Sequence, residues 1–404
     1  MMIGVVGLGY VGLVTAVVLA SQGNKVVGID TSDDKISSLN SGQLLFYEPG
    51  LKERFEEAKS MLKFSGDYSL LSRCKAIFIC VPTPNKESGI DLSYVVTASQ
   101  RIKTYAKDAA LIIKSTVIPG TAKMIQDLTG MNVISNPEFT REGSALVDTE
   151  HPDRIIIGGQ NVQICKDIWE FTSSVFVVTS NENAEMIKYA SNAFLATKIS
   201  FINQIADLCE NIPNTDVEVI AKGIGLDHRI GKEFLKAGLG YGGSCFPKDT
   251  EALTSYSKSM RVDLSLINAV INYNSERIDR LVNKILSFTG SLENKNVCIL
   301  GLSFKENTDD LRESRSLALI KKLSDYGPNI RVYDPIVKQF QGLKMCKNIN
   351  ECISDCDIII TATEWTDFKK ISSSQLEGKL VFDLRRILDV DKNQITMGVG
   401  IGKN

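Results

Sequence analysis

The sequence predicts an α/β protein with two doubly wound domains, joined by a long central helix and a small helical region. Three observations lead to this prediction: short apolar runs that end in polar loops, a glycine-rich turn near the N-terminus, and the return of the same pattern after residue 295. Continuous apolar strands followed by polar loops are typical of parallel sheets that helices cover on both faces. The chain of 404 residues is long enough for two or three domains.

The first forty residues contain a strand, a glycine turn, a helix and a second strand, in that order. Ile3–Val6 is predicted as a buried strand, Gly7-Leu-Gly-Tyr-Val-Gly12 as a tight turn, and Leu13–Ser21 as a helix. Lys25–Ile29 follows as a second strand and leads into Asp30. An acid about 20 residues after such a turn completes the βαβ dinucleotide-binding fingerprint, so we predict a Rossmann-like domain.

The turn and the acid together predict NAD as the cofactor. Gly7 permits the turn, Gly9 lets the backbone approach a pyrophosphate, and Gly12 allows close packing of helix and strand. The exposed N–H groups and the helix dipole then favour the phosphates. Asp30 would accept hydrogen bonds from the adenosine ribose, whereas it and its acidic neighbours would repel a 2′-phosphate. NAD is therefore favoured over NADP; a turn that binds no nucleotide is the alternative.

Three further strands of the first domain are predicted to end in polar loops at one edge of the sheet. In such sheets, ligands bind at the carboxyl ends of the strands, so we expect the chemistry in these loops. The strands are Ala76–Val81, Ala110–Ile113 and Val133–Ile134, and their loops are Pro82-Thr-Pro84, Lys114-Ser-Thr116 and Ser135-Asn-Pro-Glu138.

A long helical pattern separates two strand-rich halves. It runs over residues 182–211, and a helix of that length could join two domains and offer a dimer face; an ordinary core helix is the alternative. Strands return at Lys295–Leu300 and Arg331–Tyr333, after a predicted linker over Ser287–Asn294. This second Rossmann-like half lacks the three-glycine turn. The predicted regions are an NAD-binding domain at 1–182, a helical region at 183–287 and a second Rossmann-like domain at 295–404.

Composition and charge exclude several classes of protein. Lys and Arg number 46 against 48 for Asp and Glu, and a net charge of −2 does not suit nucleic-acid binding. Nine cysteines without a CxxC pair indicate a reducing, cytoplasmic compartment. With two histidines and no close Cys/His cluster, no metal site is predicted. The apolar stretch Met2–Ala20 lacks a basic start and contains four glycines, so we expect neither a signal peptide nor a membrane span.

One cysteine differs from the other eight in its surroundings. Cys245 follows a second GxGxxG match, Gly238–Gly243, which no strand precedes, and we interpret these glycines as exposing the thiol. Lys248 and Asp249 are close in sequence and could activate a nucleophilic thiol. Six other cysteines are interpreted as small hydrophobes, Cys80, Cys209 and Cys298, or as residues of surface turns whose spacing matches no usual zinc motif, Cys346, Cys352 and Cys356.

Together these residues resemble the UDP-glucose/GDP-mannose dehydrogenase family over nearly the whole chain. The matching segments occur in the family's order, and the one around the cysteine is highly specific. They are Gly7-Leu-Gly-Tyr-Val-Gly12, Tyr47-Glu-Pro-Gly50, Val81-Pro-Thr-Pro84, Lys114-Ser-Thr116, Asn136-Pro-Glu-Phe-Thr-Arg-Glu-Gly143, Lys188-Tyr-Ala-Ser-Asn192, Gly240-Tyr-Gly-Gly-Ser-Cys-Phe-Pro-Lys-Asp249, and Gly301-Leu-Ser-Phe-Lys305 with Asp309-Asp-Leu-Arg-Glu-Ser314.

The resemblance implies two Rossmann-like domains joined by a long helix, a homodimer through that helix, and NAD-dependent, four-electron oxidation of a sugar nucleotide. For this chain it implies oxidation of UDP-glucose at C6 to UDP-glucuronate, because residues 229–231 and 240–245 look more like the UDP-glucose branch than the GDP-mannose branch. Loss of one hydride gives an aldehyde that Cys245 would trap as a thiohemiacetal. Loss of a second hydride gives a thioester, which water hydrolyses.

The same resemblance implies roles for five further catalytic residues. Lys188 would stabilise negative charge at the C6 oxygen, and Asn192 lies four residues further along the same helix face. Asp249 and Thr116 would position or activate a water. Glu142 would share this work near the nicotinamide.

The residues that bind the two ligands are also implied by the resemblance. For the substrate they are Glu138, Phe139, Thr140, Arg141, Glu142, Lys188, Asn192, Arg229, Phe234, Leu235, Lys236, Ala237, Gly238, Gly242, Lys305 and Arg385. For the cofactor they are Gly7, Gly9, Tyr10, Val11, Gly12, Asp30, Lys35, Thr83, Thr116, Glu142, Lys248 and Arg312. Arg229 resembles a position that reaches across from a neighbouring subunit. The chain departs from the family at Thr140, where leucine is common, and at Phe234, where some members have tyrosine.

Three alternatives stay open at this point. A sibling enzyme would perform the same C6 chemistry on GDP-mannose or on a UDP-N-acetyl-hexosamine. A two-electron β-hydroxyacid dehydrogenase would have a similar fold but would not need the Cys245 segment. A non-catalytic NAD-binding regulator would keep the glycine turn without Lys188, Cys245 and Asp249, and all three residues are present.

Overall fold

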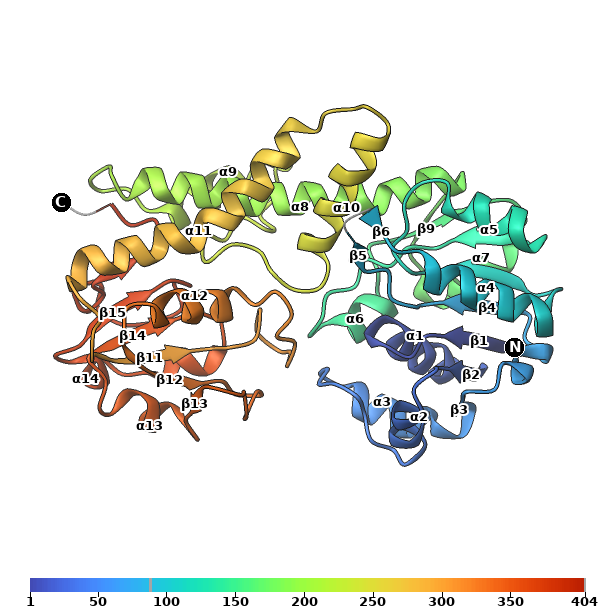
Figure 1. Cartoon of the computed structure of the whole chain (residues 1–404), viewed down its shortest axis with the longest axis horizontal. Coiled ribbons are helices and arrows are strands. Elements are labelled where there is room, and N and C mark those ends of the chain that lie inside the picture. Colours follow the sequence, from blue (N-terminus) through green and yellow to red (C-terminus); the bar gives the residue numbers. More distant parts are fainter. Residues whose placement is uncertain (87–88, 403–404) are drawn as a thin grey trace. The chain divides into compact units, whose positions relative to one another are not determined.

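The computed structural model describes residues 1–86 and 89–402; the last two residues of the third predicted region, 403–404, lie outside that part of the chain. The chain divides into two compact units (Figure 1). The first comprises Met1–Ser191 with Glu251–Val262, and the second comprises Asn192–Thr250 with Asp263–Asn404.

The first unit is built on an eight-stranded sheet with the order β10-β9-β8-β7-β4-β1-β2-β3. Neighbouring strands are parallel, except that β8 and β9 are antiparallel. From β3 to β8 this is the strand order of the dinucleotide-binding fold, which reverses between β1 and β4. The strands are β1 (Met2–Val6), β2 (Lys25–Ile29), β3 (Leu62–Ser65), β4 (Ala76–Ile79), β7 (Ala110–Ile113), β8 (Val133–Ser135), β9 (Arg154–Gly158) and β10 (Val175–Thr179). A short antiparallel pair consists of β5 (Asn85–Lys86) and β6 (Gly89–Ile90).

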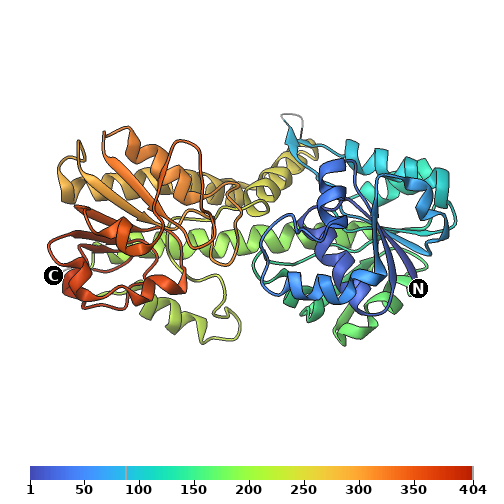
Figure 2. The same ribbon diagram turned by 90° about the horizontal axis from the view of Figure 1, so that it is seen from below.

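Helices cover both faces of this sheet, so alternate residues along a strand pack into different hydrophobic clusters. Ile3 and Val5 of β1 belong to a cluster that contains α1, whereas Val6 belongs to a second cluster that contains α4. Figure 2 shows helices on either side of the strands. The helices are α1 (Tyr10–Ser21), α2 (Asp33–Asn40), α3 (Leu51–Ala58), α4 (Ser93–Ala106), α5 (Thr121–Thr129), α6 (Ala145–Glu150) and α7 (Gln163–Trp169).

The second unit contains a six-stranded sheet with the order β13-β12-β11-β14-β15-β16, in which every pair is parallel. Counted from its own first strand, this is again the dinucleotide-binding order. The strands are β11 (Asn296–Leu300), β12 (Asn329–Tyr333), β13 (Lys344–Met345), β14 (Ile358–Thr361), β15 (Leu380–Asp383) and β16 (Met397–Gly398). The helices that follow α7 are α8 (Asn181–Cys209), α9 (Val217–Gly225), α10 (Phe246–Ser259), α11 (Ser265–Thr289), α12 (Arg315–Ser324), α13 (Ile349–Ile353) and α14 (Ser373–Leu376). The residues of α8 and α10 are shared between the two units.

The predicted fold class is confirmed: two sheets of mainly parallel strands, with covering helices, are joined by the 29-residue helix α8. Two local predictions were wrong. The predicted linker at Ser287 begins inside α11, because the helix continues to Thr289 and ends at Gly290, whose φ is +70°. The cysteines at 346, 352 and 356 do not lie in surface turns; they are buried in the core of the second unit, where apolar packing around α13 covers them. Within the described part of the chain, no helix is both long and apolar enough to cross a membrane.

Candidate active site

The glycine turn connects β1 to α1 and leaves the helix N-terminus open. Gly7 has a φ of +92°, and a Cβ on Gly12 would lie 1.8 Å from the carbonyl oxygen of Gly7, so both positions require glycine. Gly9 caps α1 without a side-chain hydrogen bond, and a Cβ there would meet no described atom within 4 Å. The first N–H groups of α1 therefore face a space that suits a pyrophosphate.

Asp30 lies beside this turn at the end of β2. Its carboxylate accepts hydrogen bonds from the backbone N–H of Leu8, at 2.8 Å, and of Ser32, at 3.0 Å. The half-exposed Lys35 holds its ammonium 3.6 Å from the same carboxylate. A carboxylate oxygen has capacity for more than one hydrogen bond, so Asp30 can still accept from a ribose hydroxyl. The turn and Asp30 thus fit NAD.

A glutamate that sequence reasoning left without a role links the turn to the loop after β8. Glu48 is 4% exposed and accepts hydrogen bonds from the hydroxyl of Tyr10 and from the backbone N–H groups of Gly143 (2.7 Å) and Leu146 (3.3 Å). Burial, this hydrogen bond and the nearby charges of Glu48 and Glu142 raise the pKa of Tyr10 well above its ordinary value. The only sequence signal for Glu48 was its place in the Tyr47-Glu-Pro-Gly50 segment.

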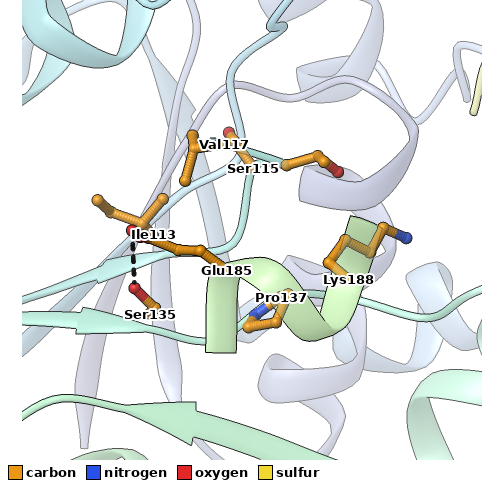
Figure 3. A pocket seen from close by; sticks show the side chains of 8 residues that line it. Ile113, Ser115, Val117, Ser135, Pro137, Glu185 and Lys188 are labelled. Carbon is orange, nitrogen blue, oxygen red and sulfur yellow. Dashed lines mark hydrogen bonds between the residues drawn. The ribbon is translucent and has the colours of Figure 1, made fainter. Parts of the chain in front are cut away.

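The loops after β4 and β7 meet through two predicted residues. The hydroxyl of Thr83 donates to the carbonyl of Thr116 at 2.8 Å. Thr116 and Lys188 line one small pocket at the ends of β7 and β8 (Figure 3). Glu185 lines it as well, accepts a hydrogen bond from Ser135, and caps α5 through two backbone N–H groups. Burial raises the pKa of Glu185 to about 7.

Lys188 and Glu138 form a buried ion pair, with 2.9 Å between the ammonium and a carboxylate oxygen. The other oxygen of Glu138 accepts from the N–H and the hydroxyl of Thr140. Burial alone would raise the pKa of Glu138, but the charge of Lys188 and these hydrogen bonds outweigh it and lower the pKa to about 2. The ring of Phe139 lies under the cations of Lys188 and Arg154. Glu138, Phe139 and Lys188, which the sequence analysis assigned to one substrate site, are therefore in contact in the structure.

A second buried lysine of the first unit, Lys114, was not among the predicted site residues. Lys114 is buried, its ammonium lies 4.9 Å from the centre of the Trp169 ring, and burial lowers its pKa. Its position in the Lys114-Ser-Thr116 segment was the available signal, but the segment alone does not distinguish a buried lysine from a solvated one.

In the second unit, Cys245 directly precedes α10. It is partly buried, and its carbonyl accepts the N–H of Asp249 at 2.8 Å, so the thiol lies at the helix N-terminus, where negative charge is favoured. The carboxylate of Asp249 is 1% exposed, is paired with Lys248, and accepts a hydrogen bond of 2.6 Å from Asn192 on α8. Four predicted residues thus lie in one constellation.

Predicted substrate residues of the second unit gather around Glu364, which follows β14. Lys236 forms an ion pair with Glu364 at 2.7 Å and Arg385 forms another at 3.3 Å. A Cβ on Gly238 would lie 2.9 Å from the guanidinium of Arg385, so this glycine allows the close approach. Glu364 is partly buried, which would raise its pKa, but Arg385, Lys236 and the nearby Lys305 lower it overall. Glu364 itself was missed by sequence reasoning.

The segment before Cys245 contains a non-glycine residue with positive φ and a glycine that allows a close backbone approach. Phe234 has a φ of +64°, and its ring lies 6.0 Å from that of Phe246. Leu235 and Ala237 are buried in the core of the second unit, so they can offer a ligand their backbone only. A Cβ on Gly242 would lie 2.1 Å from a backbone oxygen of residue 313.

Three predicted arginines each pair with a nearby aspartate. Each is exposed and forms a local ion pair with an aspartate at 2.6–2.7 Å. The pairs are Arg141 with Asp148, Arg229 with Asp227, and Arg312 with Asp310. Across the described residues, no group of three or more His, Cys, Asp or Glu side chains could hold a metal ion.

An open glycine turn with its acid, on a sheet of the dinucleotide-binding order, defines the class of protein as one that binds a dinucleotide such as NAD. Family models named for the NAD binding domain, the central domain and the UDP binding domain of one family match residues 1–176, 182–276 and 298–390. The chain belongs to the UDP-glucose/GDP-mannose dehydrogenase family.

Individual relatives are similar over nearly their full length. UDP-glucose 6-dehydrogenase YwqF of Bacillus subtilis is 41% identical, with 97% of this chain and 95% of the relative aligned. UDP-glucose 6-dehydrogenase of Rickettsia felis is 40% identical, with 95% and 92% aligned. The solved UDP-glucose dehydrogenase of Pyrobaculum islandicum has a TM-score of 0.92 at 32% identity and covers all of this chain and 98% of its own. A UDP-D-ManNAc dehydrogenase of Pyrococcus horikoshii has a TM-score of 0.87 at 26% identity, with both chains fully covered.

Proposed function

We propose that this enzyme oxidises UDP-glucose at C6 to UDP-glucuronate with two molecules of NAD⁺. One observation carries the proposal: Cys245 lies at the start of α10, next to a buried Asp249 that Asn192 and Lys248 hold in place. A two-electron dehydrogenase has no use for such a thiol. The names of the relatives from Bacillus subtilis and Rickettsia felis support the same substrate.

The chemistry needs a nucleophile that adds reversibly to an aldehyde and later leaves from a carbonyl carbon. When bound, NAD⁺ accepts a hydride from C6, once in each oxidation step. Cys245 adds to the aldehyde of the first step and gives a thiohemiacetal, and the second step leaves a thioester. Water then attacks C6, the C–S bond breaks, and the thiol is regenerated. One alcohol, one water and two NAD⁺ thus give one carboxylate, two NADH and three protons.

The charged residues have separate tasks in this scheme. The ammonium of Lys188, which Glu138 holds at 2.9 Å, stabilises negative charge on the C6 oxygen. Thr116 lines the same pocket as Lys188. We assign to Thr116 and Asp249 the task of orienting the water that acts as base and later as nucleophile. Glu142 shares this work near the nicotinamide.

Cations of the second unit supply the electrostatics for a diphosphate. Lys236, Lys305 and Arg385 surround the carboxylate of Glu364, and Glu306 lies in the same charged cluster, so three cations face two carboxyl groups and positive charge is in excess. We assign Lys305 and Arg385 to the diphosphate or ribose, and the backbone around Phe234 to the rest of the pocket. The exposed Arg229 is proposed to act across a subunit boundary.

We further propose that the enzyme is a cytoplasmic homodimer formed through α8. Phe194, Phe201 and Leu208 are spaced seven residues apart on this helix and are 65%, 48% and 57% exposed. Such a spacing makes one apolar stripe. All nine cysteines are thiols without a disulfide, as a reducing compartment requires.

The experiment is the amount of NADH formed per mole of limiting UDP-glucose, with GDP-mannose and UDP-N-acetylglucosamine in parallel. Two NADH per UDP-glucose, with the other sugars silent, is the expected result. Two NADH from another sugar nucleotide would keep the mechanism and change the substrate. One NADH would contradict the role of Cys245.

A pair of variants in one loop isolates the thiol. Cys245→Ser should lower turnover by about a thousandfold or more, because an oxygen nucleophile at this position is far weaker. Ser244→Ala removes the hydroxyl that lies 3.6 Å from the sulfur but leaves the thiol itself, so turnover should fall far less than in Cys245→Ser.

A further inference from the structure

Four cysteines of the second unit lie together in its core, and none of them is among the catalytic candidates. Cys298 is on β11 and Cys352 on α13; both are 0% exposed. Cys346 and Cys356 flank α13 on either side and are each 6% exposed. β11 is a central strand of the second sheet, so this cluster lies at the centre of the unit.

The four thiols form one continuous chain of contacts. The sulfur atoms of Cys298 and Cys352 are 2.7 Å apart. Cys298 also shares a hydrogen bond with Cys356, and Cys352 shares one with Cys346. A disulfide bond of about 2.05 Å between Cys298 and Cys352 would need a further approach of only about 0.7 Å.

The thiol of Cys356 has a lowered pKa. The hydrogen bond from Cys298 and the charge of Lys379 lower the pKa of Cys356, against the opposing effect of burial. Lys379 is anchored there, because its ammonium donates to the carbonyl of Cys356 at 3.1 Å. At the other end, burial raises the pKa of Cys346 to about 12. Since a thiolate is the form that reacts with oxidants, oxidation should begin at Cys356.

We propose that Cys298 and Cys352 form a reversible disulfide, and that a hydroperoxide creates it through Cys356. The 2.7 Å approach of the two sulfur atoms carries the proposal. The proposal concerns residues outside the proposed catalytic site and does not depend on the proposed substrate.

The steps balance with hydrogen peroxide as the oxidant. The sulfur of Cys356 attacks a peroxide oxygen, the O–O bond breaks, and a sulfenic acid and water form. Cys298 then attacks the sulfur of Cys356, the S–O bond breaks, and a second water leaves. Cys352 finally attacks the sulfur of Cys298, which forms the Cys298–Cys352 disulfide and returns Cys356 as a thiol. Two thiols lose two electrons and two protons, and one peroxide becomes two waters.

The test uses the full-length wild-type protein and detects each cysteine separately. The protein is treated with hydrogen peroxide, quenched, alkylated in denaturant and digested, and its peptides are identified by mass spectrometry. We expect a cross-linked peptide pair that joins Cys298 to Cys352 and disappears after dithiothreitol. Cys165 and Cys209, equally buried but outside the cluster, should remain alkylated. Full alkylation of Cys298 and Cys352 after peroxide has oxidised Cys245 would overturn the proposal.

Two variants test the entry point. Cys356→Ser should slow formation of the Cys298–Cys352 pair by about tenfold or more, because the acidic thiol is gone. Cys346→Ser is the matched control, with the same exposure at the other end of the chain, and should change the rate by less than about twofold. Equal rates in the two variants would remove Cys356 from the scheme.

Discussion

The two sheets have the same strand order, but the turns that follow their first strands are built for different purposes. Gly7 and Gly301 both have positive φ, at +92° and +98°. In each case the N–H of the next leucine donates, at 2.8 Å, to an aspartate at the end of the neighbouring strand, Asp30 or Asp334. The framework of the two turns is therefore the same.

The two turns differ in where the following helix begins and in how many groups the aspartate accepts. α1 begins directly at the first turn, whereas α12 begins only at Arg315, after a long irregular segment. Asp30 receives two backbone N–H groups and the ammonium of Lys35. Asp334 is 1% exposed and serves as acceptor for six groups of the protein. They are the N–H groups of Leu302, Ser303, Ile336 and Val337, the hydroxyl of Ser303 and the indole of Trp365.

The comparison shows that strand order alone does not make a dinucleotide site. The first turn presents a helix N-terminus and an acid with capacity for a ribose. The second turn is closed by the protein's own donors, and Thr363 also donates to the carbonyl of Ser303 at 3.0 Å. We therefore propose that side chains such as Lys236, Lys305 and Arg385 hold a nucleotide sugar in the second unit.

The largest effect expected from this difference is on stability. Asp334→Asn replaces one acceptor oxygen by an amide group, which strands buried donors and should lower the free energy of unfolding by about 2–4 kcal/mol. Asp30→Asn should cost less than about 1 kcal/mol, because Asp30 accepts fewer donors. Urea unfolding of both variants makes the comparison. Equal losses would mean that the two acids have the same task.

The first turn can be tested for its open space. Gly9→Ala should fold normally, because the added Cβ meets no described atom within 4 Å, yet it should weaken NAD binding by about tenfold or more through contact with the pyrophosphate. Calorimetric titration with NAD measures the affinity. Gly223→Ala on α9 is the control, since its Cβ would also meet open space and no ligand is expected there. Unchanged affinity in Gly9→Ala would place the cofactor elsewhere.

A third test asks what holds the first turn in place. Glu48→Gln keeps the size of the side chain but turns an amide group toward donors that need an acceptor, such as the N–H of Gly143. We expect kcat/KM to fall by about tenfold while the protein stays folded. Glu53→Gln, on the exposed side of α3, should leave kcat/KM within about twofold. A loss of stability without a loss of kcat/KM would make Glu48 a purely structural residue.

Much of the fold could be predicted because its signals are local. The apolar runs of β4 and β7 are continuous, and the glycine turn has its strand, helix and acid within forty residues. The end of α11 was missed because nothing in the sequence before Gly290 stops a helix at Ser287.

The parts of the site that could not be predicted depend on contacts between distant residues. Glu48 meets Gly143 across 95 positions, and Lys236 meets Glu364 across 128 positions. A single sequence gives no measure of such distances. The burial of Cys352 could not be predicted for the same reason, because its neighbour Cys298 lies 54 residues away. Local motifs placed the candidate residues, and only the fold showed their partners.

The smallest expected effect is on the pH dependence of the free energy of unfolding. Burial raises the pKa of Glu185 in the first unit to about 7, whereas Arg385 and Lys236 lower the pKa of Glu364 in the second, so of these two carboxyls Glu185 should titrate near neutrality. A carboxyl whose folded pKa lies above its unfolded value stabilises the fold at low pH, and this contribution is lost as pH rises through the folded pKa. The free energy of unfolding should therefore fall by about 1 kcal/mol between pH 6 and pH 8. In Glu185→Gln this change should vanish, because the amide does not titrate. If wild type and variant had parallel pH profiles from urea unfolding, Glu185 would be ionised throughout, and its two backbone donors at the start of α5 would outweigh its burial.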